Sequence, residues 1–406
     1  MLRYCVYQTI GEGEQMKVVQ LNAVCNGSTG KIAVALSDLL TERDIDNRIF
    51  YTGSPTEHAA CVPYMSHKEV KLQALRSKVL GTYGFHSKGA TRRLLRLLDE
   101  FAPDLVHIHN IHGHNCHLGM LFSYLKEKKI RVLWTFHDCW AFTGYCPHFI
   151  AKGCEKWQTG CHHCSQRRQY SFFFDRSSAL YHKKKALLTG LDLTIVTPSQ
   201  WMADLIGKSF LKDCPVHVIN NGIDLEIFRP RAGTFRRERG LEGKYIILGV
   251  ANYWSDLKGL DSFIALAKKL DERYVCVLVG TDDQVDQRLP DNIISIHRTQ
   301  NQQELAEIYS DADVFFNPTV EDTYPTVNME AIACGTPVVT YRTGGSPEIV
   351  TEGTGFVIDA DVDAAAAAIE KAIAEKAALQ AGCAAAAARF NKHDRFLDYI
   401  KLYTNE

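Results

Sequence analysis

The chain has 406 residues, of which 46% are hydrophobic and 23% are charged. These fractions are those of an ordinary soluble globular protein, and a chain of this length is expected to form two or three domains. The 46 Lys and Arg residues nearly balance the 47 Asp and Glu residues, which gives a formal net charge of −1. A general nucleic-acid binder would carry a basic excess, so no nucleic-acid partner is expected.

Cysteine and histidine are distributed unevenly along the chain. It contains 13 Cys and 16 His, and six of these cysteines and nine of these histidines fall between His107 and Cys164. An even distribution would put only about four of them in a window of that length. A metal centre is one explanation of such an excess.

The amino-terminal segment does not have the pattern of a targeting signal. Residues 1–15 contain no apolar core of signal-peptide length, and Glu12 and Glu14 are unusual in such a segment. No run approaches the roughly 18 apolar residues of a membrane span. We therefore expect a cytoplasmic location, with peripheral contact at the inner face of the cytoplasmic membrane. Residues 1–15 are interpreted as an extension, or as the product of a misassigned start at Met1 rather than Met16.

Short β-branched segments alternate with longer helical patterns along the chain. Such apolar strands separated by helices indicate parallel sheets that are covered on both faces. The segment from Arg229 to Gly233 separates two sets of them, which predicts two doubly wound α/β domains at residues 16–228 and 229–388. Strands are predicted at residues 17–22, 105–109, 131–137, 193–198 and 216–220, and then at residues 245–251, 274–280, 294–297, 313–318 and 337–341.

The end of the chain is predicted to be helical. Residues 362–388 are rich in Ala, the best helix former. Apolar residues at helical spacing between Asp394 and Tyr403 predict a last helix within residues 389–406, which packs back towards the amino-terminal domain.

In parallel sheets of this kind, ligands bind beyond the carboxyl ends of the strands. The first predicted strand is followed by a loop that contains Gly27 and Gly30, directly before a helix. Glycines let the backbone approach a ligand closely, and a helix N-terminus favours anions or sugar hydroxyls. A plain strand–helix turn explains the same residues equally well.

Two segments of the second domain carry charged residues that are candidates for ligand binding. Lys258 stands at a helix start, where a lysine suits a phosphate but is also common as a solvated residue. Asp322 and Glu330 lie eight residues apart, one in a loop and the other early in a helix. Paired carboxylates can hold sugar hydroxyls, whereas a lone glutamate near a helix N-terminus often only complements the helix dipole.

Several motifs occur in an order that resembles a known family, the retaining glycosyltransferases of family 4, which have the GT-B fold. They are Thr135-Phe-His137-Asp138, Thr197-Pro-Ser199, Asn221-Gly-Ile-Asp224, Lys258-Gly259, the acidic pair, Gly335-Thr-Pro-Val-Val339 and Gly344-Gly-Ser-Pro-Glu348. The resemblance extends over nearly the whole chain from Met16. Residues 137–144 further resemble enzymes of colanic-acid and capsule assembly within that family.

The resemblance implies two Rossmann-like domains that face each other across a cleft. It implies retaining transfer of a sugar, of the hexosyl type, from a UDP- or GDP-linked donor to a saccharide acceptor. This acceptor is expected to be linked to polyprenyl diphosphate, in surface polysaccharide biosynthesis. No catalytic metal is expected, because the departing phosphate itself takes the acceptor proton in the mechanism thought to operate in this family. The alternatives are a GT-B nucleotide-sugar 2-epimerase or phosphorylase, and a non-catalytic, metal-stabilised scaffold of an assembly complex.

The resemblance also implies roles for individual residues of the second domain. Glu330 matches the glutamate that holds the nucleotide ribose, and Lys258 matches the lysine that grips the donor diphosphate. The carboxylate that contacts the donor sugar is Asp322 or its neighbour Glu321. The family usually has an arginine where this chain has Tyr253, so Arg298 or Arg342 is expected to replace that cation.

In the first domain, His137 matches the family histidine that lies near the transferred sugar. Gly27 and Gly30 match the glycine-rich loop near the donor diphosphate and the acceptor. His107, His109, His112, His114 and His117 follow a predicted strand that ends at the same cleft, and each is either a ligand contact or a residue of the strand end.

Residues 88–98 combine cations with leucines. As a helix, this segment places Lys88, Arg92, Arg93 and Arg96 beside an apolar stripe, a surface that could rest on anionic lipid. The alternative is a solvated helix whose leucines face the core.

The remaining cysteines form a separate motif in a predicted insertion at residues 139–176. Cys146, Cys154, Cys161 and Cys164 could form a tetrahedral thiolate site, and Cys161 and Cys164 have the usual spacing of one half of it. The insertion has few aliphatic residues, so binding of structural Zn²⁺ would supply its folding energy. Unpaired buried thiols and redox use are the alternatives. His148, His162 and His163 are candidates to replace one cysteine.

Overall fold

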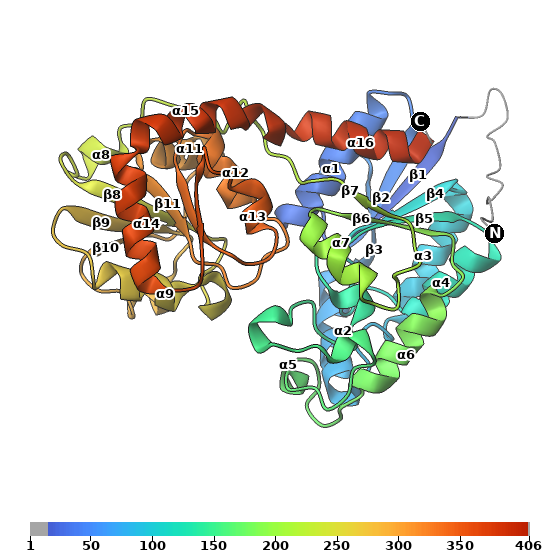
Figure 1. Cartoon of the computed structure of the whole chain (residues 1–406). Helices are drawn as coiled ribbons and strands as arrows, with labels where there is room; N and C mark the ends of the chain where they lie inside the picture. Colours follow the sequence, from blue (N-terminus) through green and yellow to red (C-terminus); the bar gives the residue numbers. More distant parts are fainter. Residues whose placement is uncertain (1–14, 405–406) are drawn as a thin grey trace.

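The computed structural model describes residues 15–404, which form two α/β domains with a parallel sheet in each (Figure 1). This architecture confirms the predicted fold class of two doubly wound domains. The predicted extension at residues 1–15 lies outside the described residues, except for Gln15. Within the part of the chain that the structure describes, no helix has the length and apolar character needed to cross a membrane.

The amino-terminal sheet has seven parallel strands in the order β3-β2-β1-β4-β5-β6-β7. The strand order reverses between β1 and β4, which are paired from Val18–Leu105 to Leu21–Ile108. The strands are β1 (Lys17–Leu21), β2 (Asp46–Gly53), β3 (Cys61–Ser66), β4 (Leu105–Ile108), β5 (Arg131–Thr135), β6 (Leu193–Thr197) and β7 (Val216–Val218). The main helices around them are α1 (Gly27–Thr41), α2 (His67–Leu80), α3 (Lys88–Phe101), α4 (Leu118–Glu127), α6 (Ser177–Leu188) and α7 (Gln200–Gly207).

The carboxy-terminal sheet has six parallel strands in the order β10-β9-β8-β11-β12-β13, and its order reverses between β8 and β11. The strands are β8 (Tyr245–Val250), β9 (Tyr274–Val279), β10 (Ile293–Ile296), β11 (Val314–Asn317), β12 (Val338–Tyr341) and β13 (Gly355–Ile358). The helices are α8 (Phe235–Glu238), α9 (Leu260–Ala267), α10 (Asp283–Asp286), α11 (Gln302–Asp311), α12 (Thr326–Ala333), α13 (Ser346–Ile349), α14 (Val362–Ala374) and α15 (Lys376–Ala386).

Three strands were not predicted from the sequence: β2, β3 and β13. Strand β3 is an edge strand that contains Pro63, and proline within a run argues against a strand because it cannot donate a ladder hydrogen bond. Strand β13 is also at an edge and has only four residues. Edge strands need little burial, so the apolar pattern that identifies central strands is weak in them.

The last helix, α16 (Lys392–Thr404), belongs to the amino-terminal domain in space. Figure 1 shows α15 and α16 in succession, leading from the carboxy-terminal domain to the amino-terminal one. Phe396, Tyr399, Ile400 and Tyr403 are buried against β1 and α1. Complete burial of such side chains contributes about 1.5–3 kcal/mol each, so this helix ties the two domains together.

The segment of residues 139–176 contains little regular structure. It consists of the turns η1 (Trp140–Phe142), η2 (Ile150–Lys152) and η3 (Lys156–Gln158) and the four-residue helix α5 (Arg167–Tyr170). The rings of Phe142 and Phe149 lie 5.3 and 4.9 Å from that of Trp157, and this cluster joins the domain core.

The structure supports the alternative in which α3 is a solvated helix with its leucines towards the core. Leu94 and Leu98 are buried in the core, and Leu95 and Leu97 pack against it. Arg93 pairs with the Glu69 carboxylate at 2.7 Å, and both side chains are partly exposed. The apolar stripe of α3 is explained by its packing in the core of the domain.

Candidate active site

The site lies where the two sheets reverse their strand order. The loop after β1 leads into α1, the loop after β8 carries η4 (Asp256–Lys258), and the loop after β11 carries Asp322. Such reversals leave a crevice beyond the carboxyl ends of the strands, where α/β proteins bind their ligands. The topology therefore brings the candidate residues of each domain to the carboxyl ends of its strands, at the point where the strand order reverses.

Lys258 and Asp322 form an ion pair across the β8–β11 reversal. The Nζ atom of Lys258 lies 2.6 Å from Oδ2 of Asp322, and both side chains are partly exposed. Gly259 makes this approach possible, because it has a φ of +77° and a Cβ there would lie 2.2 Å from the carbonyl oxygen of Pro318. Gly344 is similarly constrained, because a Cβ on it would lie 1.7 Å from the carbonyl oxygen of Asp322.

Glu330 occupies the interior side of the same crevice, on α12. Tyr309 donates its hydroxyl hydrogen to Oε2 of Glu330 at 3.1 Å. Burial raises the pKa of the Glu330 carboxyl to about 7, although the hydrogen bond from Tyr309 and the charge of Lys31 act to lower it. Lys31 is the fifth residue of α1, so a cation of the amino-terminal domain acts on a carboxylate of the other domain.

Glu321, the neighbour of Asp322, is engaged elsewhere. Its carboxylate accepts backbone hydrogen bonds from Phe149 at 2.9 Å and from Ala151 at 3.1 Å, and His148 Nδ1 lies 3.7 Å away. Burial acts to raise the pKa of Glu321, but these donors outweigh it, and the pKa is lowered. The buried glutamate therefore holds the insertion against the carboxy-terminal domain.

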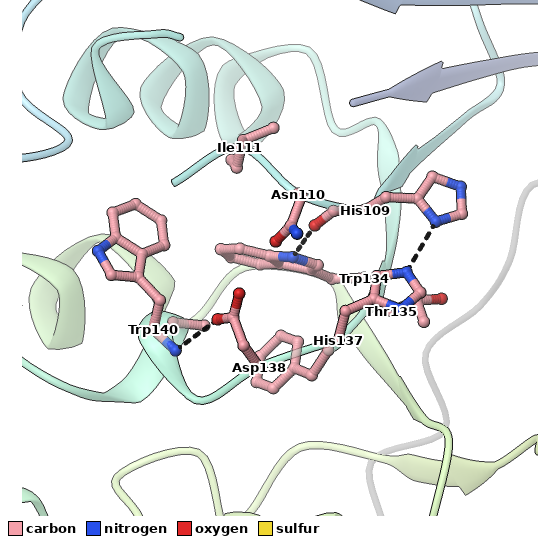
Figure 2. Close-up of a pocket in the computed structure, with 10 residues that line it drawn as sticks. His109, Asn110, Ile111, Trp134, Thr135, His137, Asp138 and Trp140 are labelled. Carbon is pink, nitrogen blue, oxygen red and sulfur yellow. Dashed lines mark hydrogen bonds between the residues drawn. The ribbon is translucent and has the colours of Figure 1, made fainter. Parts of the chain in front are cut away.

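His137 lies at the end of a buried chain of hydrogen bonds (Figure 2). Its Nε2 atom is 3.3 Å from Nδ1 of His109, the contact that Figure 2 draws. Nε2 of His109 is in turn 2.9 Å from Oε1 of Gln20. Because the Gln20 oxygen can only accept, His109 donates to it, and Nδ1 of a neutral His109 is left to accept from His137. Burial lowers the pKa of His137 to about 4, so the ring is neutral near neutral pH.

His137 also lies at the contact between the domains. Its carbonyl oxygen accepts a hydrogen bond of 3.0 Å from Oγ1 of Thr323, one residue after Asp322. A second contact joins the domains at α7, where Glu348 accepts from the backbone N–H groups of Gln200 and Trp201, both at 2.8 Å. These contacts fix His137 relative to the loop that carries Asp322.

The other histidines between His107 and His117 contact neighbouring groups within the amino-terminal domain. His107 Nδ1 lies 2.6 Å from the hydroxyl of Tyr403, and His112 pairs with Asp138 at 3.3 Å. His117 caps α4 through its Nδ1, and the His114 ring lies edge-on to Tyr83 with the centroids 5.3 Å apart. Most of the histidine excess thus stabilises the fold around His137.

The glycine loop precedes the free N-terminus of α1. Gly27 has a φ of +75° with open space around it. A Cβ on Gly30 would lie 2.5 Å from the backbone carbon of Cys25, so only glycine fits there. The first turn of α1 contains no acidic residue, which leaves its N–H groups suited to an anion.

The structure does not join Arg298 or Arg342 to the cluster of Lys258 and Asp322. Arg298 is exposed in the loop after the edge strand β10, and no hydrogen bond or ion pair between described residues connects it to that cluster. Arg342 pairs with Asp359 at 3.4 Å. Tyr253 is 63% exposed beside the loop of Lys258.

Lys31 was not identified from the sequence as a site residue, and His109 was named only as one of five histidines with two interpretations. Lys31 acts on Glu330 from the other domain, and its position directly after Gly30 is a signal that could have found it. His109 positions His137, but nothing in the sequence distinguishes it from the other histidines of the window.

The two reversals, the lysine–carboxylate pair and the half-buried Glu330 agree with the expected GT-B glycosyltransferase. Two family models match the chain in succession, "Glycosyltransferase Family 4" at residues 29–227 and "Glycosyl transferases group 1" at residues 232–390. The chain belongs to the family 4 glycosyltransferases.

Similar proteins come from several bacteria. The putative colanic acid biosynthesis glycosyl transferase WcaC of Escherichia coli K12 is 24% identical over 63% of this chain and 64% of its own length. A D-inositol 3-phosphate glycosyltransferase of Corynebacterium jeikeium is 28% identical over 43% of this chain and 47% of its own. The chain thus matches less than two thirds of the length of either relative.

Solved structures share the fold over nearly the whole chain. Sucrose-phosphate synthase of Thermosynechococcus elongatus matches with a TM-score of 0.70 and 17% identity over 96% of this chain and 99% of its own. HepE of Anabaena, in complex with UDP and glucose, matches with a TM-score of 0.68 and 15% identity over 97% of this chain and 100% of its own.

Proposed function

We propose that this protein transfers a sugar from a nucleotide sugar to a saccharide acceptor with retention of the anomeric configuration. The observation that carries the proposal is the placement of Lys258, Asp322 and Glu330 at the reversal of the carboxy-terminal sheet, facing Lys31 and His137 of the other domain. The structure of HepE with UDP and glucose supports a UDP-linked donor, and GDP is the other nucleotide considered.

Each residue has a role in this proposal. Lys258 binds the donor diphosphate and releases Asp322, which then accepts hydrogen bonds from the hydroxyls of the transferred sugar. Glu330 accepts from the nucleotide ribose. Glu321 stays bound to the insertion, so Asp322 is the carboxylate that hydrogen-bonds the transferred sugar. The N-terminus of α1 faces the diphosphate from the other domain.

The proposed chemistry needs no protein base. The bond between the anomeric carbon and the donor phosphate breaks, and the acceptor oxygen bonds to that carbon on the same face. The acceptor proton passes to the departing diphosphate oxygen. Lys258 and the α1 N-terminus stabilise the charge that builds on the diphosphate, while the neutral His137 hydrogen-bonds the transferred sugar.

The acceptor is proposed to be a polyprenyl-diphosphate-linked saccharide of surface polysaccharide assembly. The similarity to WcaC supports this pathway class. The proposed membrane contact is the apolar patch, which we define as Leu72, Leu75, Val79, Leu80, Phe172, Phe173 and Phe174, all more than a third exposed. It replaces α3 as the lipid-facing surface.

The apolar patch joins two segments that are distant in the sequence. The backbone N–H of Phe172 donates to the carbonyl of Lys78 on α2 at 2.9 Å, and the Arg176 guanidinium lies 5.3 Å from the Phe174 ring. Figure 1 shows α2 and α5 together at the lower end of the amino-terminal domain. Exposed aromatic rings beside cations suit an anionic phospholipid surface.

The proposal is tested with the purified full chain and a panel of UDP- and GDP-sugars. A thermal-shift screen selects the donor, because a bound donor stabilises the folded chain. NMR of the product with a polyprenyl-diphosphate-linked acceptor then gives the anomeric configuration. We expect an α-linked product from an α-linked donor. An inverted product would contradict retention, and epimerised donor without transfer would contradict the transferase.

A further inference from the structure

The four cysteines of the predicted zinc site, Cys146, Cys154, Cys161 and Cys164, are not gathered around one point. Among the described residues, no three of their sulfur atoms lie within 4.8 Å of one another. The structural Zn²⁺ expected there stays a prediction from the sequence. A different pair of thiols, outside the insertion, is in direct contact.

This pair is Cys25 and Cys61, which meet beside the glycine loop. Their Sγ atoms lie 2.9 Å apart, and the two thiols are hydrogen-bonded although 36 residues separate them in the sequence. Both are free thiols. A disulfide bond is about 2.05 Å long, so the two sulfur atoms would have to approach by less than about 1 Å to form one. The fold therefore places the two thiols in reach of bond formation.

The two cysteines differ in their access to solvent. Cys25 lies in the loop between β1 and α1, and its side chain is only 9% exposed. Cys61 is the first residue of the edge strand β3 and is half-buried. A small reagent from solvent therefore reaches Cys61 more readily than Cys25.

A histidine and an aspartate favour the thiolate form of Cys61. The N–H of Cys61 donates to the carbonyl of His58 at 3.0 Å, and Nε2 of His58 lies 2.9 Å from Oδ1 of Asp38. Burial acts to lower the pKa of His58, but the Asp38 carboxylate outweighs it and the pKa is raised. The hydrogen bond with Cys25 and the charge of His58 lower the pKa of Cys61 to about 7, against the effect of burial.

The partner thiol has the opposite character. The hydrogen bond with Cys61, together with burial, raises the pKa of Cys25. A thiolate can only accept, so the S–H of Cys25 donates to a thiolate at Cys61. Thiols that react with peroxides combine these features, because the exposed thiolate is the nucleophile and a neighbouring cysteine resolves the product. Cys61 is thus suited to attack, and Cys25 to resolve.

We propose that Cys25 and Cys61 are a redox-active pair, in which hydrogen peroxide oxidises Cys61 and Cys25 then closes a disulfide. The Cys61 thiolate attacks one oxygen of the peroxide, the O–O bond breaks, and the released hydroxide takes up a proton to become water. The Cys25 sulfur then attacks the sulfur of the Cys61 sulfenic acid, the S–O bond breaks, and the leaving hydroxide takes the Cys25 proton as a second water. The two thiols lose two electrons, which reduce the peroxide. A dithiol reductant reopens the bond by two thiol–disulfide exchanges.

The disulfide joins the glycine loop to the start of β3. A Cβ on Gly30 would lie 2.5 Å from the backbone carbon of Cys25, so the loop packs tightly against the beginning of α1. The carbonyl of Ala23, in the same loop, accepts from the N–H and the hydroxyl of Thr52 at 3.2 and 2.8 Å. A covalent bond at Cys25 therefore acts on the segment that positions the N-terminus of α1. The bond is measured without donor or acceptor, so the proposal does not depend on the transferase activity.

The first test treats the reduced full chain with hydrogen peroxide, blocks the remaining thiols by alkylation, and maps the peptides by mass spectrometry. We expect a peptide pair linked through Cys25 and Cys61, which dithiothreitol separates. Cys25→Ser should form no such link and should leave Cys61 as a sulfenic acid, whereas Cys214→Ser, at another half-buried cysteine, should link like the wild type. No link in the wild type, or a link from Cys61 to a different cysteine, would overturn the proposal.

A second test leaves both cysteines in place, in case Cys25→Ser does not fold. A thiol-alkylating reagent is applied to the reduced chain near neutral pH, and the rate is measured at each cysteine. Cys61 should react at least about tenfold faster than Cys214, whose pKa is raised by burial. His58→Gln should slow the reaction of Cys61, and His217→Gln, at an exposed histidine on β7, should not. Equal rates at Cys61 and Cys214, or a Cys61 rate that His58→Gln leaves unchanged, would overturn the assignment of Cys61 as the attacking thiol.

Discussion

The ammonium group of Lys258 lies 2.6 Å from the carboxylate of Asp322, so the proposed diphosphate-binding cation and the proposed sugar-binding carboxylate neutralise each other in the ligand-free chain. Both side chains are partly exposed, and such a pair contributes only about 0–1 kcal/mol to stability. A donor can therefore separate the two at little cost, and each is then free to bind a different part of it.

The adjacent acidic residues Glu321 and Asp322 should respond oppositely to substitution. Asp322→Ala should lower kcat at least tenfold with little change in Tm, because it removes a ligand contact. Glu321→Ala should lower the free energy of unfolding by about 1–3 kcal/mol, because it leaves the buried N–H of Phe149 and the part-buried N–H of Ala151 without an acceptor. Chemical denaturation and steady-state kinetics measure the two effects. A Glu321→Ala variant of wild-type stability would contradict the assignment.

Glu330 should make stability depend on pH. Its pKa of about 7 in the folded chain lies above the ordinary value of 4.5, so its contribution is full below pH 4.5 and is lost as the pH rises through 7. Glu330→Gln cannot ionise. As the pH rises from about 5 to about 8, the difference in free energy of unfolding between Glu330→Gln and the wild type should therefore change by about 2–3 kcal/mol in favour of the variant. Urea unfolding at the two pH values measures this, and a constant difference would count against the buried carboxyl.

His109 should act by positioning His137. His137→Ala should lower kcat at least tenfold, and His109→Leu should lower kcat by a smaller factor without changing donor KM, because it removes the acceptor that orients the His137 ring. His217→Ala, at an exposed histidine on β7, is the matched control. Since the pKa of His137 is about 4, its ring should add no inflection to the kcat profile between about pH 6 and about pH 8. An inflection in this range that His137→Ala abolishes would contradict the neutral ring.

The apolar patch should govern binding to anionic vesicles. Phe172→Ser/Phe173→Ser/Phe174→Ser should weaken co-sedimentation with phosphatidylglycerol vesicles at least tenfold, because each exposed ring contributes buried area at the lipid surface. Arg92→Ala/Arg93→Ala/Arg96→Ala should leave it nearly unchanged, since α3 turns its leucines to the core. The reverse pattern would place the membrane contact on α3.

The interior strands of both sheets except β2 could be predicted because they are buried on both faces, which leaves an apolar run in the sequence. The edge strand β3, with Pro63, leaves no such signal. The single Ala-rich helix expected at residues 362–388 is divided at Glu375 into α14 and α15, because intrinsic propensity does not set where a helix turns against its neighbours.

The order of motifs pointed to Lys258, Asp322 and Glu330, but local sequence could not separate Asp322 from Glu321. The difference depends on Phe149 and Ala151, which lie 172 and 170 positions before Glu321. The action of Lys31 on Glu330 likewise depends on how the two domains meet. Such information is contained in tertiary packing and leaves no local pattern.

The most direct test of the central claim is the release of nucleoside diphosphate from the selected donor by wild-type and Lys258→Ala chains, in the presence of acceptor. Lys268→Ala, at an exposed lysine on the same domain, serves as the control. We expect Lys258→Ala to release nucleoside diphosphate at least tenfold more slowly while keeping its Tm, with Lys268→Ala at the wild-type rate. Release by Lys258→Ala at the wild-type rate, or no release by the wild-type chain from any UDP- or GDP-sugar, would contradict the account.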